Sequence, residues 1–190
     1  TGSVKSRPHC TRILIMYFAN FPLIPYDSVG NGEFKLVTNL LKRVAVRTKV
    51  RTNILLFDTY DVKEGETPEM LADKLYGDSN LHWIIMYVNN ITDRYHQWPL
   101  STPQFLAFIN DKYSNPDGTH HYEITQTSGD TKVTIDIGSD NTSHASATLI
   151  TNREYEESRQ DTLRRIRLLD SEYVDQFVEE FVNLIGASVL

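Results

Sequence analysis

The sequence contains a single cysteine, Cys10, among its 190 residues, so an intrachain disulfide is excluded. This cysteine usage is compatible with a reducing compartment. Long hydrophobic runs are also absent, because the stretch 13–18 is far shorter than the roughly twenty apolar residues that a membrane-spanning helix needs. Asn20 and Pro22 interrupt that stretch, which argues against a secretory signal peptide. We therefore expect neither a membrane span nor secretion.

Catalytic motifs are missing as well. The sequence has no phosphate-binding P-loop, no dinucleotide-binding fingerprint and no Gly-x-Ser-x-Gly elbow. His120, His121 and His144 are candidate metal ligands, but their spacing fits no tetrahedral pattern, and surface histidines are the better interpretation. Glu64 and Glu66 form a possible carboxylate pair, yet their position in a turn favours ordinary exposed residues. The sequence thus predicts no enzymatic activity, no cofactor and no metal site.

Charge is distributed unevenly along the chain. The net charge is −6, but residues 1–57 hold nine Lys or Arg and only two Asp or Glu. The acidic total, and the lack of aromatic residues in the basic stretch 42–51, argue against nucleic-acid binding. A basic start beside an acidic body favours electrostatic matching within the protein or with neighbours, and an ordinary solvated surface is the alternative.

The first part of the chain has few signals of regular structure. Segment 17–34 mixes prolines and glycines with aromatic residues and predicts an extended arm that packs on another surface. The aromatic residues concerned are Tyr17, Phe18, Phe21 and Tyr26. Segment 35–57 fits a strand or a short helix. Because the chain begins with Thr1, Met16 is a candidate natural start, and residues 1–15 would then be an upstream extension.

The most informative stretch is 60–90, which predicts a strand followed by two helices. Apolar and charged residues alternate at its start, as in a half-buried strand. Gly65 suits the following turn, Thr67 is an N-cap, and Pro68 fits the first helical position. Gly77 predicts the end of this helix. A second helix follows, capped by Asp78 or Ser79 and ended by Asn89-Asn90, with an apolar face of Trp83, Ile84, Tyr87 and Val88.

Further elements follow this stretch. Ser101 or Thr102 is positioned to cap a helix that starts at Pro103, and its apolar face would contain Phe105, Leu106, Phe108 and Ile109. Period-two alternation at 122–125 and 133–137 predicts a β-hairpin around 128–130, and 147–150 is a candidate third strand. The charged segment 152–168 fits either a strand edge or a helix flank.

The last predicted element is an amphipathic helix that begins after Asp170 or Ser171 and ends at Gly186. Its apolar stripe consists of Tyr173, Val174, Phe177, Val178, Phe181, Val182 and Ile185. Burial of this stripe contributes on the order of 10–20 kcal/mol before the entropy of ordering is subtracted. The helix must therefore dock, either on the core of its own chain or on another subunit.

Residues of the central stretch resemble a LysM domain, a β-α-α-β module that often binds glycans containing N-acetylglucosamine. The resemblance is carried by Val62-Lys63, Gly65, Thr67-Pro68, Leu71-Ala72, Tyr76-Gly77, Trp83, Ile84 and Asn89. The closing strand motif of that family is absent, and residues 91–99 stand in its place. By this resemblance a glycan-type groove would be lined by Gly65, Glu66, Thr67, Pro68, Asn89, Asn90 and Ile91.

From residue 16 to residue 188 the chain resembles the baseplate wedge proteins of T-even-like contractile-tailed phages, the gene fifty-three type. The carriers are Tyr17-Phe18, Pro25-Tyr26, Lys42-Arg43-Val44, Tyr76-Gly77, Trp83, Asn89-Asn90, Trp98-Pro99-Leu100, Leu163 to Ile166, Tyr173-Val174, Phe177 and Phe181. The resemblance implies a structural role in the virion tail, assembled in the host cytoplasm. The implied partners are other wedge proteins and the sheath-initiating protein, in a large hetero-oligomeric assembly.

We therefore predict an α+β fold with four segments: an arm (1–57), a LysM-like domain (58–112), a β-hairpin region (113–152) and a docking segment with the helix (153–190). The predicted function is to clamp neighbouring wedge subunits together and to the inner baseplate. The alternative is a peptidoglycan-binding module of a phage protein that targets the cell wall. On the first interpretation, deletion of 171–190 would leave a soluble module that no longer joins the wedge.

Overall fold

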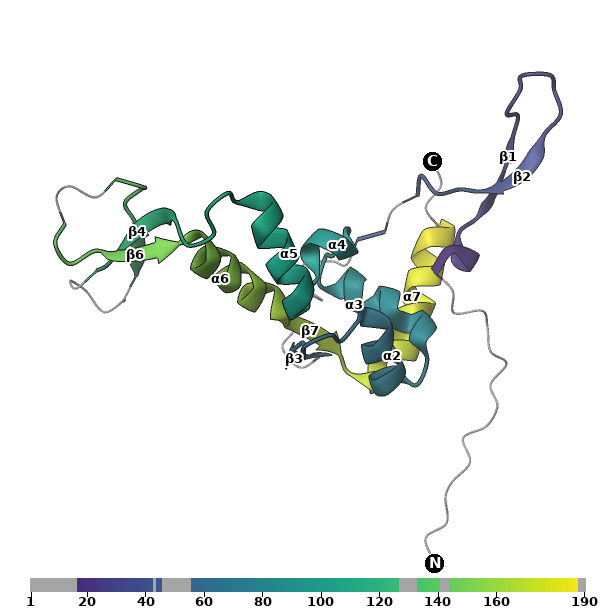
Figure 1. The fold of residues 1–190 in the computed structure, drawn as a ribbon. Helices are drawn as coiled ribbons and strands as arrows, with labels where there is room; N and C mark the ends of the chain where they lie inside the picture. The colour runs from purple at the N-terminus through teal and green to yellow at the C-terminus, as the bar shows by residue number, and fades with distance from the viewer. Residues whose placement is uncertain (1–16, 43, 46–55, 127–132, 141–143, 188–190) are drawn as a thin grey trace, which may run out of the picture. The chain divides into compact units, whose positions relative to one another are not determined.

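The structure is a computed structural model that describes residues 17–42, 44–45, 56–126, 133–140 and 144–187 (Figure 1). These residues form a mixed α and β fold, which confirms the predicted α+β class. Cys10, most of the basic stretch 42–51 and the predicted turn 128–130 lie outside the described residues.

The described part of the chain contains strands, α-helices and short 3₁₀-helices in mixed order. The strands are β1 (Leu23–Tyr26), β2 (Lys35–Thr38), β3 (Phe57–Asp61), β4 (Thr119–Thr125), β5 (Thr134–Asp136), β6 (Thr148–Thr151) and β7 (Arg165–Leu169). The α-helices are α2 (Pro68–Tyr76), α3 (His82–Val88), α4 (Arg94–Gln97), α5 (Thr102–Lys112), α6 (Asn152–Arg164) and α7 (Val174–Ala187). The 3₁₀-helices are η1 (Tyr17–Asn20), η3 (Ser79–Leu81) and η4 (Ser171–Tyr173).

The strands form three small sheets, with the orders β1–β2, β3–β7 and β5–β4–β6. The chain also divides into two compact units. Unit 1 contains the described residues of 1–59, 66–92 and 167–190, and unit 2 contains those of 60–65 and 93–166. The division passes through β3 and β7, so each unit keeps part of that pair. The four sequence segments remain a prediction.

Helix α2 begins and ends where the sequence predicts. The Thr67 hydroxyl accepts a hydrogen bond from the Met70 backbone N–H at 3.3 Å, and Pro68 occupies the first helical position. Gly77 closes the helix in the left-handed conformation, with a φ of 73°. Leu71 is fully buried on the inner face. Each of these signals acts within one helical turn, which is why the sequence alone identifies them.

Aromatic rings form the core of unit 1. The centroid of Trp83, on α3, lies 4.8 Å from that of Phe181 and 6.2 Å from that of Phe177, both on α7. Tyr17 of η1 lies 5.4 Å from Trp83, and Tyr87 lies 5.7 Å from Phe181. Each such pair contributes about 0.5–1.5 kcal/mol beyond the burial of its area. The two ends of the described chain therefore pack on α3.

Helix α6 supplies buried hydrogen-bond acceptors to other parts of unit 2. Glu156 is only 1% exposed, and its carboxylate accepts hydrogen bonds from Lys112 Nζ at 2.6 Å and Tyr113 Oη at 2.9 Å, at the end of α5. Burial by itself would raise the pKa of Glu156, but these two donors outweigh it and hold the pKa below its ordinary value. One turn further along α6, Gln160 Oε1 accepts the Leu100 N–H at 2.8 Å.

The predicted pairing of the strands at 122–125 and 133–137 is confirmed. Strand β4 pairs antiparallel with β5, with Ile124 opposite Ile135, and with β6, with Tyr122 opposite Leu149. The segment 152–168, for which a strand and a helix both remained open, contains the whole of α6 and most of β7. The alternation of arginine and apolar residues in β7 gives the burial pattern of a half-buried strand.

Two expectations are wrong. Gly186 does not end the terminal helix, because α7 continues to Ala187. Ile185, the residue before this glycine, is 1% exposed. The segment 17–34 is not an extended arm: it contains η1 and β1, and β1 pairs antiparallel with β2, with Leu23 opposite Thr38.

Candidate functional site

The first half of the predicted groove lies at the turn before α2. Gly65 is exposed, with a φ of 75° that glycine adopts without strain. Glu66 pairs with Lys74 Nζ at 3.4 Å, and the Thr67 hydroxyl caps α2. Pro68 is fully buried. The polar side chains of Glu66 and Thr67 are therefore engaged with α2, Thr67 at its first turn and Glu66 with Lys74 in its last turn.

The second half of the predicted groove ends α3 in a Schellman motif. The Ile91 N–H donates to Met86 O at 2.8 Å, and the Asn90 N–H donates to Tyr87 O at 3.2 Å. Asn90 has a φ of 58°, the left-handed conformation that this motif requires. These backbone groups satisfy the last carbonyls of α3, so the conformation of Asn90 has a structural cause.

The side chain of Asn89 joins α3 to β7. Its Oδ1 accepts the Arg167 N–H at 2.8 Å, and its Nδ2 donates to Arg167 O at 2.7 Å and to Ile85 O at 2.8 Å. This reciprocal pair reproduces the hydrogen bonding of a neighbouring strand. Most of the hydrogen-bonding capacity of the amide is therefore used inside the fold.

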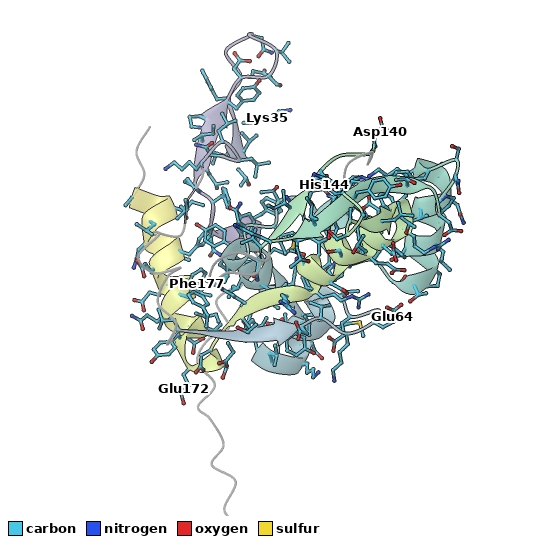
Figure 2. The ribbon with its side chains drawn as sticks, turned by 90° about the vertical axis from the view of Figure 1, so that its left-hand side faces the viewer. Lys35, Glu64, Asp140, His144, Glu172 and Phe177 are labelled. Carbon is cyan, nitrogen blue, oxygen red and sulfur yellow. The ribbon has the colours of Figure 1, made fainter. Side chains whose placement is uncertain are left out.

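The predicted docking helix is α7, on which Figure 2 labels Phe177. The residues of its apolar stripe differ in burial. Val174, Phe181 and Ile185 are buried, and Phe177, Val178 and Val182 are half-buried. Tyr173, which lies in η4, is 40% exposed. Phe181 and Phe177 contact Trp83, so α7 docks on the core of its own chain. Docking of α7 on another subunit remains a prediction.

The aromatic residues at the start of the described chain divide into two groups. Phe21 is buried, and Tyr17 packs on Trp83 and Phe181, so these two side chains find their surface within the chain. Phe18 and Tyr26 remain exposed. The segment therefore packs on another surface of the same chain through Tyr17, as expected, whereas a surface that covers Phe18 and Tyr26 remains a prediction.

The pairing of β1 with β2 is the feature of this segment that the sequence did not predict. Figure 1 shows the two strands side by side, and Figure 2 labels Lys35 at the start of β2. All four residues of β2 are exposed. The exposed apolar residues of the hairpin and its flanks are Leu23, Tyr26, Val29, Phe34, Leu36, Val37, Leu40 and Leu41. Exposed apolar groups gathered in this way mark an interaction surface.

The histidines make contacts within unit 2. His120 Nδ1 lies 2.8 Å from His121 Nδ1, and His120 stacks on Tyr155 with centroids 3.9 Å apart. His121 Nε2 lies 3.0 Å from Glu123 Oε1. Within the described ranges, no three His, Cys, Asp or Glu side chains are arranged to hold a metal ion. None of the described helices has both the length and the apolar character needed to span a membrane.

Comparison with known proteins gives the family. The family model described as base plate wedge protein 53 matches residues 16–184. The chain is also similar to the baseplate wedge protein gp53 of Enterobacteria phage T4, with 28% identity over 99 residues. That match covers 52% of this chain and 45% of the relative, so it spans less than half of the relative's length. Since the family model covers most of the sequence, the chain belongs to the base plate wedge protein 53 family.

Proposed function

We propose that the chain is a structural component of a phage tail baseplate wedge, which holds neighbouring wedge subunits together and to the inner baseplate. The observation that carries the proposal is the family match over residues 16–184. The similar protein of phage T4 is named a baseplate wedge protein, and this similarity supports the same role. In this role the chain acts by contact and needs no catalytic group.

The proposed partners are other wedge proteins and the sheath-initiating protein, in the virion tail and after assembly in the host cytoplasm. Two surface features favour protein partners. The β1–β2 hairpin exposes apolar side chains on a two-stranded sheet, and the stretch 56–190 carries an acidic excess. Exposed apolar side chains and surface charge are both typical of protein interfaces.

We further propose that β3, α2, α3 and β7 form a LysM-like β-α-α-β module that is used for protein contact. β7 supports this by pairing with β3, although it follows α3 by more than seventy residues in the sequence. The Asn89 amide, hydrogen-bonded to Arg167, ties the end of α3 to β7. Residues 91–99, which occupy the position of the LysM closing strand, contain α4 instead.

The predicted groove residues fit a structural role better than sugar binding. Thr67 caps a helix, Asn89 is bonded to β7, and Trp83 is only 6% exposed. A carbohydrate site usually needs an accessible aromatic face and free polar groups. The ring of Trp83 instead packs against Phe181 of α7. Sedimentation of the full chain with insoluble peptidoglycan checks this point. Binding that competes with free chitin oligomers would support the glycan alternative.

The decisive experiment uses the phage that encodes this chain. An amber mutation in its gene should stop tail assembly at incomplete baseplates in a non-suppressing host, and the gene supplied in trans should restore complete tails. Mass spectrometry of purified wild-type tails should detect the chain. Intact baseplates without the chain, or tails that never contain it, would overturn the proposed function.

A further inference from the structure

Asn31 and Gly32 form the only Asn-Gly sequence of the chain. They lie in the loop that connects β1 and β2, and both residues are exposed (Figure 1). An asparagine followed by glycine is especially prone to deamidation, because glycine has no Cβ to hinder the approach of its backbone nitrogen to the side-chain amide carbon. The sequence and the exposure together make Asn31 a candidate modification site.

The reaction needs only water as a second reactant. The backbone nitrogen of Gly32 loses its proton to solvent base and attacks Cγ of Asn31, and Nδ2 takes up a proton and leaves as ammonia. The product is a cyclic imide in which Cγ is bonded to the Gly32 nitrogen. Water then opens the ring at either carbonyl and gives aspartate or, when the backbone continues through the side-chain carbon, isoaspartate. The overall change converts asparagine and water into an aspartyl residue and ammonia.

The attacking nitrogen is engaged in the folded loop. The Gly32 N–H donates a hydrogen bond to Asp27 Oδ2 at 2.8 Å. This bond is the largest cause of the lowered pKa of Asp27, so the carboxyl group is ionised at neutral pH. A carboxylate attracts the amide proton and repels the negative charge that the nitrogen acquires when it loses that proton. Asp27 therefore makes the Gly32 nitrogen a poorer nucleophile.

Other backbone groups of the loop hold this carboxylate in position. Asp27 Oδ1 accepts the Gly30 N–H at 2.6 Å and the Val29 N–H at 3.1 Å. Because these two bonds fix one oxygen, the other oxygen stays directed at Gly32. Release of the Gly32 N–H therefore requires local opening of the loop, which is infrequent in the folded chain.

A contact of the asparagine itself acts in the opposite direction. Asn31 Oδ1 accepts the Glu33 N–H at 3.1 Å. A donor to this oxygen makes Cγ more electrophilic and stabilises the charge that develops on the oxygen during attack. This bond joins neutral groups, whereas the shorter bond from Gly32 to Asp27 has an ionised acceptor, and bonds of that kind are about twice as strong. The protecting contact therefore outweighs the activating one.

We propose that Asn31 is a deamidation site that the Asp27 carboxylate protects in the folded hairpin. The site is independent of the proposed baseplate role. Conversion would add a carboxylate to a loop that already contains Asp27 and Glu33, and isoaspartate would also add a methylene group to the backbone before Gly32. Both changes weaken the hydrogen bond between Gly32 and Asp27, so conversion would loosen the connection between β1 and β2.

The test measures deamidation of the full wild-type chain in mildly alkaline buffer, with and without guanidinium chloride. The tryptic peptide 13–35 contains both Asn20 and Asn31, and fragmentation in the mass spectrometer assigns the gain in mass to one of them. We expect Asn31 to convert at least fivefold faster in guanidinium chloride than in the folded chain. Asn20, which precedes Phe21, is the internal reference and should convert more slowly than Asn31 in the denaturant. Conversion of Asn31 that is equally fast in both solutions, or absent from both, would overturn the proposal.

Two substitutions of Asp27 separate the carboxylate from the rest of the fold. Asp27→Asn keeps an acceptor oxygen without the charge, and Asp27→Ala removes both. Without denaturant, we expect Asn31 to convert at least twofold faster than in wild type in Asp27→Asn, and at least fivefold faster in Asp27→Ala. In guanidinium chloride the three chains should convert at rates within twofold of one another, because the unfolded loop does not hold Asp27 beside Gly32. Wild-type rates in both folded variants would show that other parts of the fold protect Asn31 and would overturn the proposal.

Discussion

Substitution of Phe181 by alanine tests whether α7 belongs to the core of this chain. Phe181 is 3% exposed, and its ring centroid lies within 6 Å of those of Tyr17, Trp83 and Tyr87. Truncation removes the transfer free energy of the ring and leaves a cavity between η1, α3 and α7. Such substitutions destabilise proteins by about 3–5 kcal/mol. Native stabilities are about 5–15 kcal/mol, so unit 1 would lose a large part of its stability.

The assay uses tryptophan fluorescence during urea unfolding. Trp83 lies in unit 1 and Trp98 in unit 2, so a Trp98→Phe background leaves Trp83 as the reporter of its own unit. Leu184→Ala is the matched control on the same helix, because Leu184 is 36% exposed, and we expect it to cost less than about 1 kcal/mol. The reasoning is refuted if Phe181→Ala costs no more than this control.

Three further predictions concern single groups. As pH falls below 4.5, the ordinary pKa of Glu156, wild-type unit 2 should lose stability more steeply than Glu156→Gln, measured by urea unfolding across pH. The sign follows because a depressed carboxylate pKa stabilises the fold above the unfolded value and loses that contribution as the group is protonated. Tyr87→Phe should raise stability by about 1 kcal/mol, since the Tyr87 hydroxyl is buried without a hydrogen-bond partner among the described residues, and burial raises its pKa to about 12. A thermal melt in which Tyr87→Phe is less stable than wild type would contradict that assignment. Thr67→Ala should cost about 0.5–2 kcal/mol by the same Trp83 titration, whereas Thr67→Ser, which keeps the capping oxygen, should cost less than half as much.

The sequence predicts the elements whose signals are local. Thr67, Pro68 and Gly77 each act on backbone groups within one turn, and the structure confirms all three. The β4–β5 pair follows from period-two alternation, and the confirmed third strand β6 completes that sheet. These features need no knowledge of distant residues, which is why reading the chain segment by segment finds them.

Pairing between distant residues was not predictable in the same way. The eight residues between β1 and β2 exceed the short loops that identify a hairpin from sequence, and Pro22 and Pro25 favoured an irregular arm. The burial of Glu156 depends on Lys112 and Tyr113, which lie more than forty residues away. Similarly, β7 pairs with β3, and no local sequence motif predicts this pairing.

The structure also changes where a contact with partners should be sought. Deletion of 171–190, the test suggested by the sequence, would uncover Trp83 and Tyr87 because α7 packs on both. The truncated chain would lose its core together with any docking function, and failure to assemble would not separate the two. The hairpin has no such conflict, since Leu23 and Leu36 contribute little to the core. Substitutions on the hairpin can therefore remove a contact while unit 1 keeps its fold, and the exposed apolar residues of the hairpin are the more informative place to test assembly.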